Sequence, residues 1–302
     1  MRYQVTHITT YRYHEHVAVS NNLVHLAPRT LPHQQILDHH LEISPSAVAL
    51  HRHTDWFGNL AGSFAIEQPH KTLVVTARSL VERQAPLPVE SFLTPSWERV
   101  AGALGRVDPS LREVVEFVDE SPLVPALPQF LKYAVDDFTP GAPVLTVALA
   151  VMSRIHKEFR YDSEATSVHT PVAEALALRH GVCQDFSLVL IGVLRSRGLA
   201  ARYVSGYLET SPPPGRPRLV GADATHAWVQ VHTGDATIGE DGWIDLDPTN
   251  DCIPGERHIT VAYGRDFADV SPLKGMILGG GQAKVDVSVD VERLPDGDWD
   301  QK

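Results

Sequence analysis

One cysteine, one histidine and one aspartate occur in this chain in an order that suits nucleophilic catalysis. Cys183 lies in the run Gly-Val-Cys-Gln-Asp-Phe, and His226 in Thr-His-Ala-Trp and Asp247 in Leu-Asp-Pro-Thr follow it. A thiol nucleophile needs a base that takes up its proton, and that base needs a third group to orient it. If the three side chains meet, the chemistry is acyl transfer.

The residues around Cys183 predict that it begins a helix. Apolar side chains recur at helical spacing over 186–194, and Gly198 is suited to end the element. Thr170-Pro171 marks the start of the preceding helix, which Gly181 is expected to end in a left-handed conformation. A helix N-terminus favours a thiolate, and the N–H groups of its first turn can bind an oxyanion. Cysteine is also a common buried packing residue, so position alone leaves that alternative open.

A predicted hairpin makes His226 and Asp247 neighbours. Residues 226–232 and 242–247 have the character of strands, and the loop between them is centred near 236–237. With that centre, His226 lies directly opposite Asp247. Opposed Cβ atoms in an antiparallel pair are about 4.5–5.5 Å apart, within reach of an Asp–His hydrogen bond. Asp245, two residues away on the same strand face, is the alternative orienting residue.

Three residues near the predicted triad are candidate substrate-binding residues. Gln184 and Asp185 follow the cysteine, and they either line a cleft or brace the helix. Trp228 shares a strand face with His226 and so is suited to wall a cleft, although packing in the core is its more ordinary role. The proline-rich run 212–217 is either a lid or a passive surface loop.

The chain divides into a β-rich region and a mixed region. The first part reads as short alternating strands separated by turn residues, which is typical of an antiparallel sandwich or barrel. Helical spacing begins beyond a proline-rich linker near residue 88. The predicted units are a β-rich domain (1–88), a catalytic domain (89–280, with a helical lead-in 89–160 and a core 161–275), a strand suited to return to a sheet (281–293) and a polar tail (294–302).

Composition limits the classes of function. The chain has 302 residues, of which 43% are hydrophobic and 21% charged, as in ordinary globular proteins. A net charge of −11 disfavours binding to nucleic acid or to an anionic membrane. No apolar run approaches the roughly 20 residues of a bilayer span, and the N-terminus lacks the apolar segment of a signal peptide. These features predict a cytoplasmic protein.

Cysteine and histidine usage predicts neither a metal nor another cofactor. Cys183 and Cys252 are the only two cysteines, too few for a disulfide framework or a Cys-x-x-Cys site. A bridge between them is disfavoured in a reducing compartment. The 16 histidines are scattered, and their strand-like pairs at 14–16 and 51–53 are better interpreted as polar strand faces than as metal ligands.

The combined motifs resemble the bacterial transglutaminase-like family, whose members are often proposed to be cysteine proteases. The likeness runs from about residue 169 to residue 273. Asp-Trp-Phe-Gly-Asn at 55–59 resembles the β-rich region that accompanies this domain. The runs that carry the likeness are those around Cys183, His226 and Asp247, together with Arg-Tyr-Val-Ser-Gly-Tyr (202–207), His-Ile (258–259), Tyr-Gly-Arg-Asp (263–266) and Ala-Asp-Val (268–270).

This resemblance implies an α+β fold with a papain-like, transglutaminase-like core, in which the helix bearing the cysteine packs on an antiparallel sheet. It assigns Cys183 as nucleophile, His226 as general base and acid, and Asp247 as the orienting residue. The implied function is hydrolysis of peptide or amide bonds in a peptide or protein substrate. Transfer to an amine, as in a transglutaminase, is the alternative, and a β-domain binding module with a dispensable triad is a third interpretation. The sequence does not fix the oligomeric state.

Overall fold

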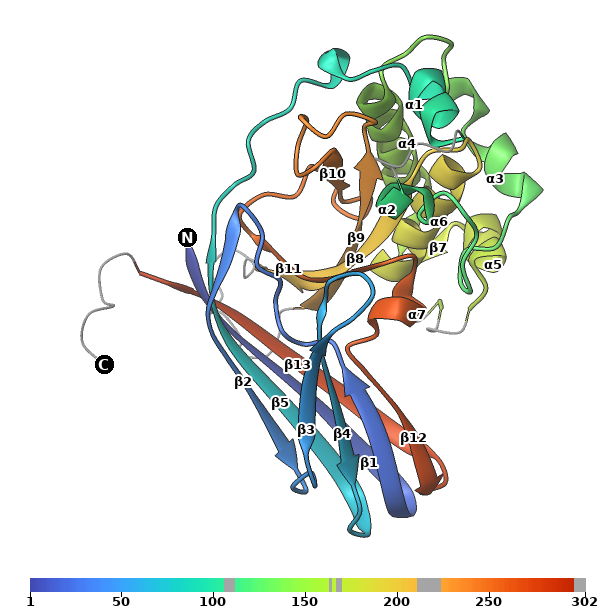
Figure 1. Ribbon diagram of the computed structural model, residues 1–302. Helices are drawn as coiled ribbons and strands as arrows, with labels where there is room; N and C mark the ends of the chain where they lie inside the picture. Colours follow the sequence, from blue (N-terminus) through green and yellow to red (C-terminus); the bar gives the residue numbers. More distant parts are fainter. Residues whose placement is uncertain (106–111, 163–164, 167–169, 211–223, 296–302) are drawn as a thin grey trace, which may run out of the picture.

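One long strand, β1 (Arg2–Val24), organises a seven-stranded antiparallel sheet in the computed structural model of the protein (Figure 1). Its first half lies between β5 (His70–Arg83) and β13 (Ala283–Leu294), and its second half lies mainly between β4 (Leu60–Ile66) and β12 (Leu273–Gly279). The remaining strands, at the outside of the order β2-β5-β1-β4-β3, are β2 (Gln34–Ser44) and β3 (Leu50–Thr54). The structure describes residues 1–105, 112–162, 165–166, 170–210 and 224–295.

The β-rich N-terminal region that the alternation predicts is confirmed, and its strands form one curled sheet. The pairing of β1 with β5 shifts register between Arg12 and Val17, and such irregularities increase the local bend of a strand. The curl encloses its own small apolar core, which includes Val17, Phe64 and Leu73. The segment predicted to return to a sheet is β13, which pairs with β1 from Arg2 onward. Both ends of the chain therefore contribute to one sheet.

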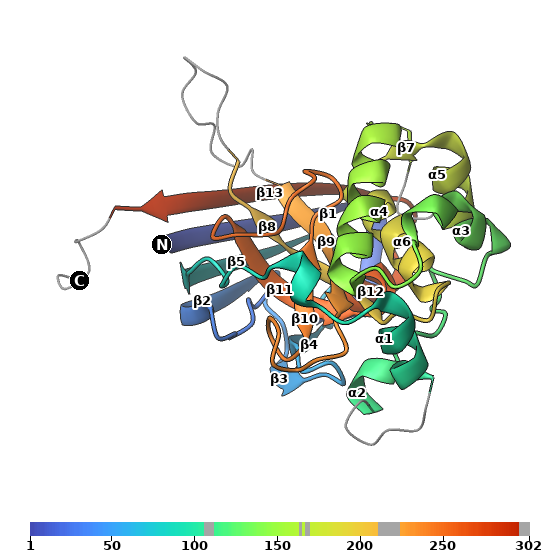
Figure 2. The same ribbon diagram turned by 90° about the horizontal axis from the view of Figure 1, so that it is seen from above.

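The α+β fold class is also confirmed. A four-stranded antiparallel sheet has the order β10-β9-β8-β11, and helices cover one side of it (Figures 1 and 2). Its strands are β8 (Ala201–Leu208), β9 (Ala224–His232), β10 (Trp243–Leu246) and β11 (His258–Gly264). The helices are α1 (Trp97–Leu104), α2 (Arg112–Val115), α3 (Pro128–Tyr133), α4 (Val144–Glu158), α5 (Val172–Leu178), α6 (Cys183–Arg195) and α7 (Phe267–Val270). Short 3-10 turns lie at Ser91–Leu93 and Val135–Asp137, and β6 (Arg160–Tyr161) pairs in parallel with β7 (His180–Gly181).

The central helix α6 is buried along almost its whole length. Every residue after Cys183 is buried, which explains the apolar character of the helix on all sides. Gly192 allows α3 to approach, since a Cβ there would lie 2.3 Å from the ring of Phe130. The helix thus fixes the position of its one less buried residue, Cys183. Within the described residues, no helix is long and apolar enough to cross a bilayer.

Two buried amides attach the N-terminal region to the outer edge of β11. The side chain of Gln34 donates to the carbonyl of Thr260 (2.7 Å) and accepts from its N–H (2.9 Å). Asn59 does the same with Tyr263, at 2.7 and 2.8 Å. Each side-chain amide therefore replaces a missing neighbouring strand, and the edge of the sheet is satisfied without one. These bonds hold β11, and with it one side of the candidate site, against the N-terminal region.

Candidate active site

A tight turn presents Cys183 at the N-terminus of α6. Val182 N donates to Asp185 Oδ2 at 2.8 Å, and Thr166 donates to the same oxygen at 2.6 Å. Gly181 has φ 154°, and a Cβ on it would lie 2.3 Å from Asp185 Oδ2. Glycine is therefore required here so that the carboxylate can fold back over the turn. Asp185 braces the start of the helix.

The preceding helix ends differently from the sequence-based expectation. We expected Gly181 to be the left-handed residue, but α5 ends at Leu178 and Arg179 has φ 55°. Pro171, not Thr170, occupies the position before the first helical residue. The difference arises because residues 180–181 pair as a strand with β6, and so the helix must stop earlier. The glycine serves the close approach of Asp185 instead.

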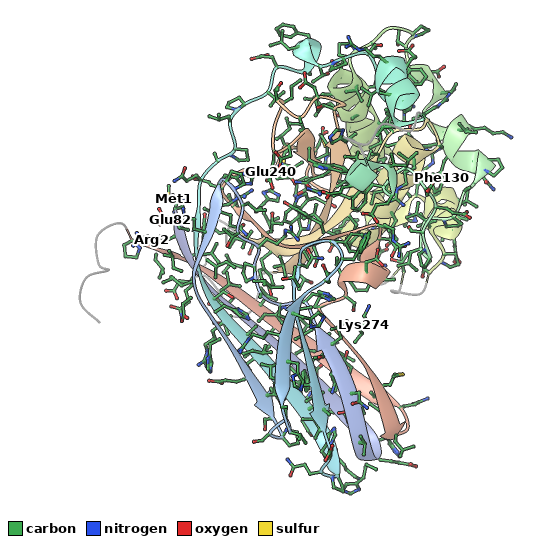
Figure 3. All side chains as sticks on the ribbon, viewed as in Figure 1. Met1, Arg2, Glu82, Phe130, Glu240 and Lys274 are labelled. Carbon is green, nitrogen blue, oxygen red and sulfur yellow. The ribbon has the colours of Figure 1, made fainter. Side chains whose placement is uncertain are left out.

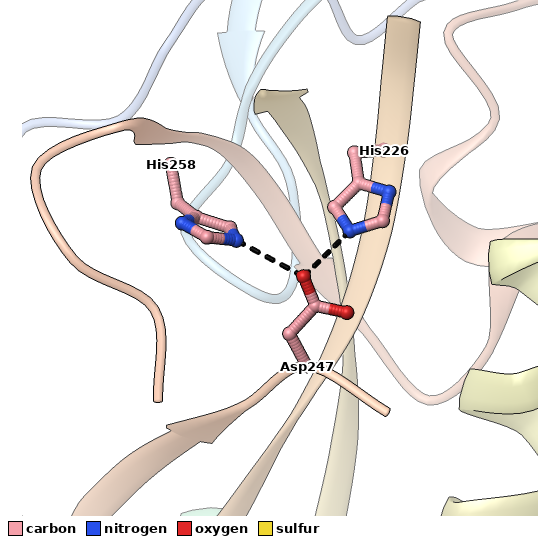
Figure 4. A group of neighbouring side chains, drawn as sticks. All are labelled: His226, Asp247 and His258. Atoms are coloured by element: carbon pink, nitrogen blue, oxygen red, sulfur yellow. Dashed lines mark hydrogen bonds and ion pairs between the residues drawn. The ribbon is translucent and has the colours of Figure 1, made fainter. Parts of the chain in front are cut away.

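His226 and Asp247 meet as predicted, but through a different register. His226 Nε2 lies 2.8 Å from Asp247 Oδ2 (Figure 4). In the hairpin, however, Trp243 pairs with His232 and Leu246 with Val229, so His226 is two positions away from direct opposition to Asp247. A shift of two residues keeps both side chains on the same face, and a diagonal contact replaces the direct one. The predicted register was wrong, whereas the predicted pair of neighbours is present.

Cys183 contacts the same histidine from the other side. The thiol is one of the groups that raise the pKa of His226. Nε2 of His226 faces Asp247, so that Nδ1 remains for the sulfur. His226 and Asp247 are buried, and Cys183 is partly exposed. The structure therefore brings the three predicted residues together as Cys183–His226–Asp247.

A second histidine, which the sequence reasoning did not single out, shares Asp247. His258 Nε2 lies 3.0 Å from Asp247 Oδ2, the same oxygen that faces His226 (Figure 4). Asn250 Nδ2 donates to that oxygen as well, at 2.7 Å. The other carboxylate oxygen accepts from two backbone N–H groups, those of Thr249 and Asn250. The only sequence signal for His258 was its place in the His-Ile run that resembles the family. The predicted hairpin could not place it near Asp247, because His258 comes from β11, which pairs with β8 and not with the hairpin.

These contacts determine the charges in the site. Burial alone would lower the pKa of His226, but hydrogen bonds to Asp247 and Cys183 outweigh it and raise that pKa to about 10. Burial alone would raise the pKa of Asp247, but the hydrogen bonds from His226 and His258 hold it well below its usual range. Asp247 is therefore an anion at neutral pH, and His226 is held as an imidazolium.

The other candidate residues lie at different positions around Cys183, His226 and Asp247. Gln184 is buried on the first turn of α6. Trp228 has no exposed surface, so it packs beside the site and makes no direct contact with a substrate. It donates from Nε1 to Asp245 Oδ1 at 2.7 Å. Asp245, the alternative orienting residue, is thus bonded to Trp228 and is separate from the His226 contact. The run 212–217 lies outside the described residues.

Tyr161 is a further residue near the thiol that sequence reasoning missed. The pairing of β6 with β7 sets it beside Gly181, two residues before Cys183. Its ring contacts the edge of Phe186, and 56% of the residue is exposed. Two causes raise the pKa of the Tyr161 phenol: burial of part of the ring is the larger, and the nearby Cys183 is the smaller. The phenol therefore stays neutral. Tyr161 is therefore an exposed aromatic side chain close to the partly exposed thiol of Cys183.

The two cysteines are separate and differ in environment. Both are free thiols. Cys252 makes backbone hydrogen bonds in both directions with Asp247. Burial, and then the nearby carboxylates, raise the pKa of Cys252 to about 11, so this thiol stays protonated at neutral pH.

The shared carboxylate also belongs to the one group of potential metal ligands among the described residues. Three potential ligand atoms lie within 4.8 Å of one another, one each from His226, Asp247 and His258. Two imidazoles and a carboxylate are a donor set that suits Zn²⁺. The sequence did not indicate this group, because its members come from β9, β11 and the end of β10. Metal binding would take the nitrogen of His226 that faces Asp247, so it would compete with the triad.

Comparisons with known proteins identify the same two regions. Residues 3–82 match the bacterial transglutaminase-like N-terminal region, and residues 134–248 match the transglutaminase-like superfamily. An uncharacterized protein of Mycobacterium tuberculosis is 42% identical over 298 residues, which covers 96% of this chain and 92% of that protein. A shorter match, 28% identical over 140 residues, is to a protein-glutamine gamma-glutamyltransferase of Pseudomonas aeruginosa, and it covers 41% of this chain and 20% of that protein.

A solved structure has the same fold over nearly the whole chain. The crystal structure of a "putative cysteine protease" from Cytophaga hutchinsonii superposes with a TM-score of 0.74 at 20% identity, covering 99% of this chain and 92% of that one. Both the β-rich region and the core are therefore shared as one arrangement. The chain belongs to the bacterial transglutaminase-like family.

Proposed function

We propose that this protein is a cysteine hydrolase that cleaves amide bonds in peptides through an acyl-enzyme. The observation that carries the proposal is that His226 pairs with Asp247 at 2.8 Å and also interacts with the thiol of Cys183. Asp247 is fully buried and anionic, and it fixes which nitrogen of His226 faces the thiol. This is the arrangement that activates a nucleophile and then returns a proton to the leaving group.

The steps follow from the positions of the three groups. The sulfur of Cys183 attacks the carbonyl carbon of the substrate, and its proton is held on His226. The protonated His226 then gives this proton to the leaving amine, and a thioester to Cys183 remains. Water attacks the thioester while His226 takes one of its protons, and the acid leaves as the thiol is restored. Asp247 keeps the ring in place and stabilises its charged form throughout.

The turn at Gly181 supplies a place for the oxyanion. The first N–H groups of a helix have no partner within the helix, and Cys183 is the first residue of α6. A carbonyl carbon bonded to its sulfur would place the developing negative charge close to these groups. The brace between Asp185 and Val182 holds the backbone of the turn fixed before substrate arrives.

Transfer of the acyl group to an amine is the second candidate. The match to the Pseudomonas protein-glutamine gamma-glutamyltransferase, 28% identical over 140 residues, favours it. The triad chemistry is the same in both cases up to the thioester, and the acceptor decides between them. We favour water, because the partly exposed Cys183 is accessible to solvent.

Thiol labelling tests the assignment of the nucleophile. Iodoacetamide at mildly acidic pH should modify Cys183 well ahead of Cys252, whose raised pKa keeps it protonated. Adducts are mapped by mass spectrometry, with Cys252→Ala as the matched control that should label like wild type. Equal and slow modification of both cysteines would reject Cys183 as an activated thiol.

A peptide library with a labelled amine separates the two acceptors. Hydrolysis predicts cleaved or deamidated peptides without label, and amine transfer predicts labelled glutamine side chains. Cys183→Ala should abolish either product while thermal unfolding stays close to wild type, because little packing is lost at the end of the helix. If Cys183→Ala unfolds the protein, the cysteine has a packing role instead.

A further inference from the structure

Three arginines lie at the junction between the N-terminal sheet and the catalytic sheet, and of these Arg83 is buried while Arg29 and Arg202 are partly buried. Arg29 precedes β2, Arg83 ends β5 and Arg202 lies on β8. The guanidinium carbons of Arg29 and Arg202 lie 4.4 and 3.9 Å from the centre of the Tyr263 ring. Arg202 also lies 4.1 Å from the ring centre of Trp243. We call Arg29, Arg83, Arg202 and Tyr263 the arginine cluster.

Arg83 is the unexplained member of this cluster. The residue is 0% exposed, and its Nε, Nη1 and Nη2 have no hydrogen-bond partner. Its backbone groups are satisfied by Met1, so only the charged end lacks partners. A guanidinium stays charged in proteins, and burial of an unpaired charge is strongly unfavourable. Something must therefore accept from Arg83.

Other unpaired groups belong to the same junction. Hydrogen-bond partners are also lacking for four other atoms there, Arg29 Nε, the hydroxyl of Tyr263, His33 Nε2 and Glu240 Oε2. Glu240 comes from the loop before β10, which Figure 3 shows approaching the end of the N-terminal sheet that carries Met1 and Glu82. His33 is the other titratable group there, with Nδ1 3.7 Å from Glu240 Oε2.

The carboxylates around the cluster are not paired with its arginines. Glu240, Asp245 and Asp55 are the carboxylates whose charge acts on these arginines. In the part of the chain that the structure describes, none of them forms an ion pair with Arg29, Arg83 or Arg202. Burial raises the pKa of Glu240. Burial, together with the charge of Arg83, lowers the pKa of His33 to about 4, so His33 is neutral and contributes no charge.

We propose that the arginine cluster binds a small inorganic anion, with the guanidinium of Arg83 as its main ligand and Arg29 Nε and the Tyr263 hydroxyl as further donors. This site involves none of the triad residues and does not depend on the proposed function. An anion there would satisfy the three nitrogens of Arg83. Because Arg83 belongs to the N-terminal sheet and Tyr263 to the catalytic sheet, the anion would join the two.

Anion-dependent stability tests the proposal on the full chain. The unfolding temperature is measured while chloride replaces gluconate at constant ionic strength, with phosphate as a second titrant. We expect a saturable rise on the order of 5 °C in wild type, because a ligand that binds only the folded state stabilises it. The rise should vanish in Arg83→Met. It should persist in Arg78→Met, which removes an exposed arginine from the same strand.

The result also identifies the anion. If phosphate reaches half-maximal stabilisation at a lower concentration than chloride does, these donors bind an oxoanion. The reverse order would assign a halide. If neither anion stabilises wild type, or if Arg83→Met responds as wild type does, the proposal is wrong. Should Arg83→Met fail to fold, two measurements remain. Tyr263→Phe should weaken the apparent affinity several-fold, and a bromide-soaked crystal should show an anomalous peak beside Arg83. Ordered water alone at Arg83 would overturn the site.

Discussion

His258 Nε2 lies 3.0 Å from Asp247 Oδ2, so one carboxylate oxygen receives two imidazoles. Each imidazole must donate, since the oxygen of an ionised carboxylate only accepts. The Nδ1 of His258 is buried without a hydrogen-bond partner. The ring packs edge-on against Trp228, with centroids 5.3 Å apart. His258 therefore acts on the site through Asp247, as a positioning residue.

Replacement of His258 should change the pH profile as well as the rate. His258→Phe removes one donor from Asp247, and we expect kcat/KM to fall by roughly 10- to 100-fold, as for other groups that orient a ligand or base. The freed carboxylate then holds the proton of His226 more strongly, so the alkaline limb of the profile should move to higher pH. His258→Gln keeps an N–H donor and should largely restore both. A rate loss with an unmoved limb in both variants would indicate a purely structural role.

Replacement of Asp247 should slow the reaction by several orders of magnitude. Asp247→Asn removes the charge that raises the pKa of His226, so we expect kcat to fall by about 10³- to 10⁴-fold. The alkaline limb should also move down from the region of pH 10. Asp245→Asn is the matched control, because its amide oxygen can still accept from Trp228. Near-normal turnover in Asp247→Asn together with collapse in Asp245→Asn would transfer the orienting role to Asp245.

Stability should decline in alkaline solution because of His226. Its pKa is about 10 in the folded protein and about 6.5 in an unfolded chain. The contribution is therefore complete below pH 6.5 and is lost progressively as pH rises towards 10. Urea unfolding of wild type at several pH values should show this fall in the free energy of unfolding. His226→Asn should give a flatter dependence over the same range, and an equally steep one would contradict the assignment.

A methyl group at Gly181 should disturb the turn that carries Cys183. Its Cβ would lie 2.3 Å from Asp185 Oδ2, and its φ of 154° is unfavourable for other residues. We expect Gly181→Ala to cost about 1–3 kcal/mol of folding free energy and to slow alkylation of Cys183. Gly102→Ala in α1 is the control, because no atom lies within 4 Å of the added group. In a helix that change should be neutral or stabilising by up to about 1 kcal/mol.

Local sequence patterns were sufficient for the parts of the site that neighbouring residues determine. The apolar spacing after Cys183 predicts a helix that starts there, and α6 does. The hairpin prediction failed in register because a tight turn at 240–243 brings Trp243 opposite His232, which a loop treated as symmetrical does not reveal. Because the register differs by an even number of residues, the predicted strand face of both side chains was still correct.

Groups that meet only through tertiary structure were not predictable in this way. His258 reaches Asp247 because β11 pairs with β8, on the far side of β8 from the hairpin. Asp185 turned out to brace its own helix, which depends on Gly181 and Thr166. The arginine cluster combines residues that lie far apart in the sequence, and each of its arginines alone resembles an ordinary surface arginine. Periodicity carries no information about such encounters.

The position of β13 beside β1 has a consequence for the order of events during synthesis. Residues 2–13 of β1 need residues 283–294 on one side, and the whole catalytic region lies between them in the chain. A growing chain on the ribosome therefore presents β1 with one open edge until residues 283–294 have been made. We expect this edge of the sheet to close late, and a chaperone that covers exposed strand edges to act on the first part of the nascent protein.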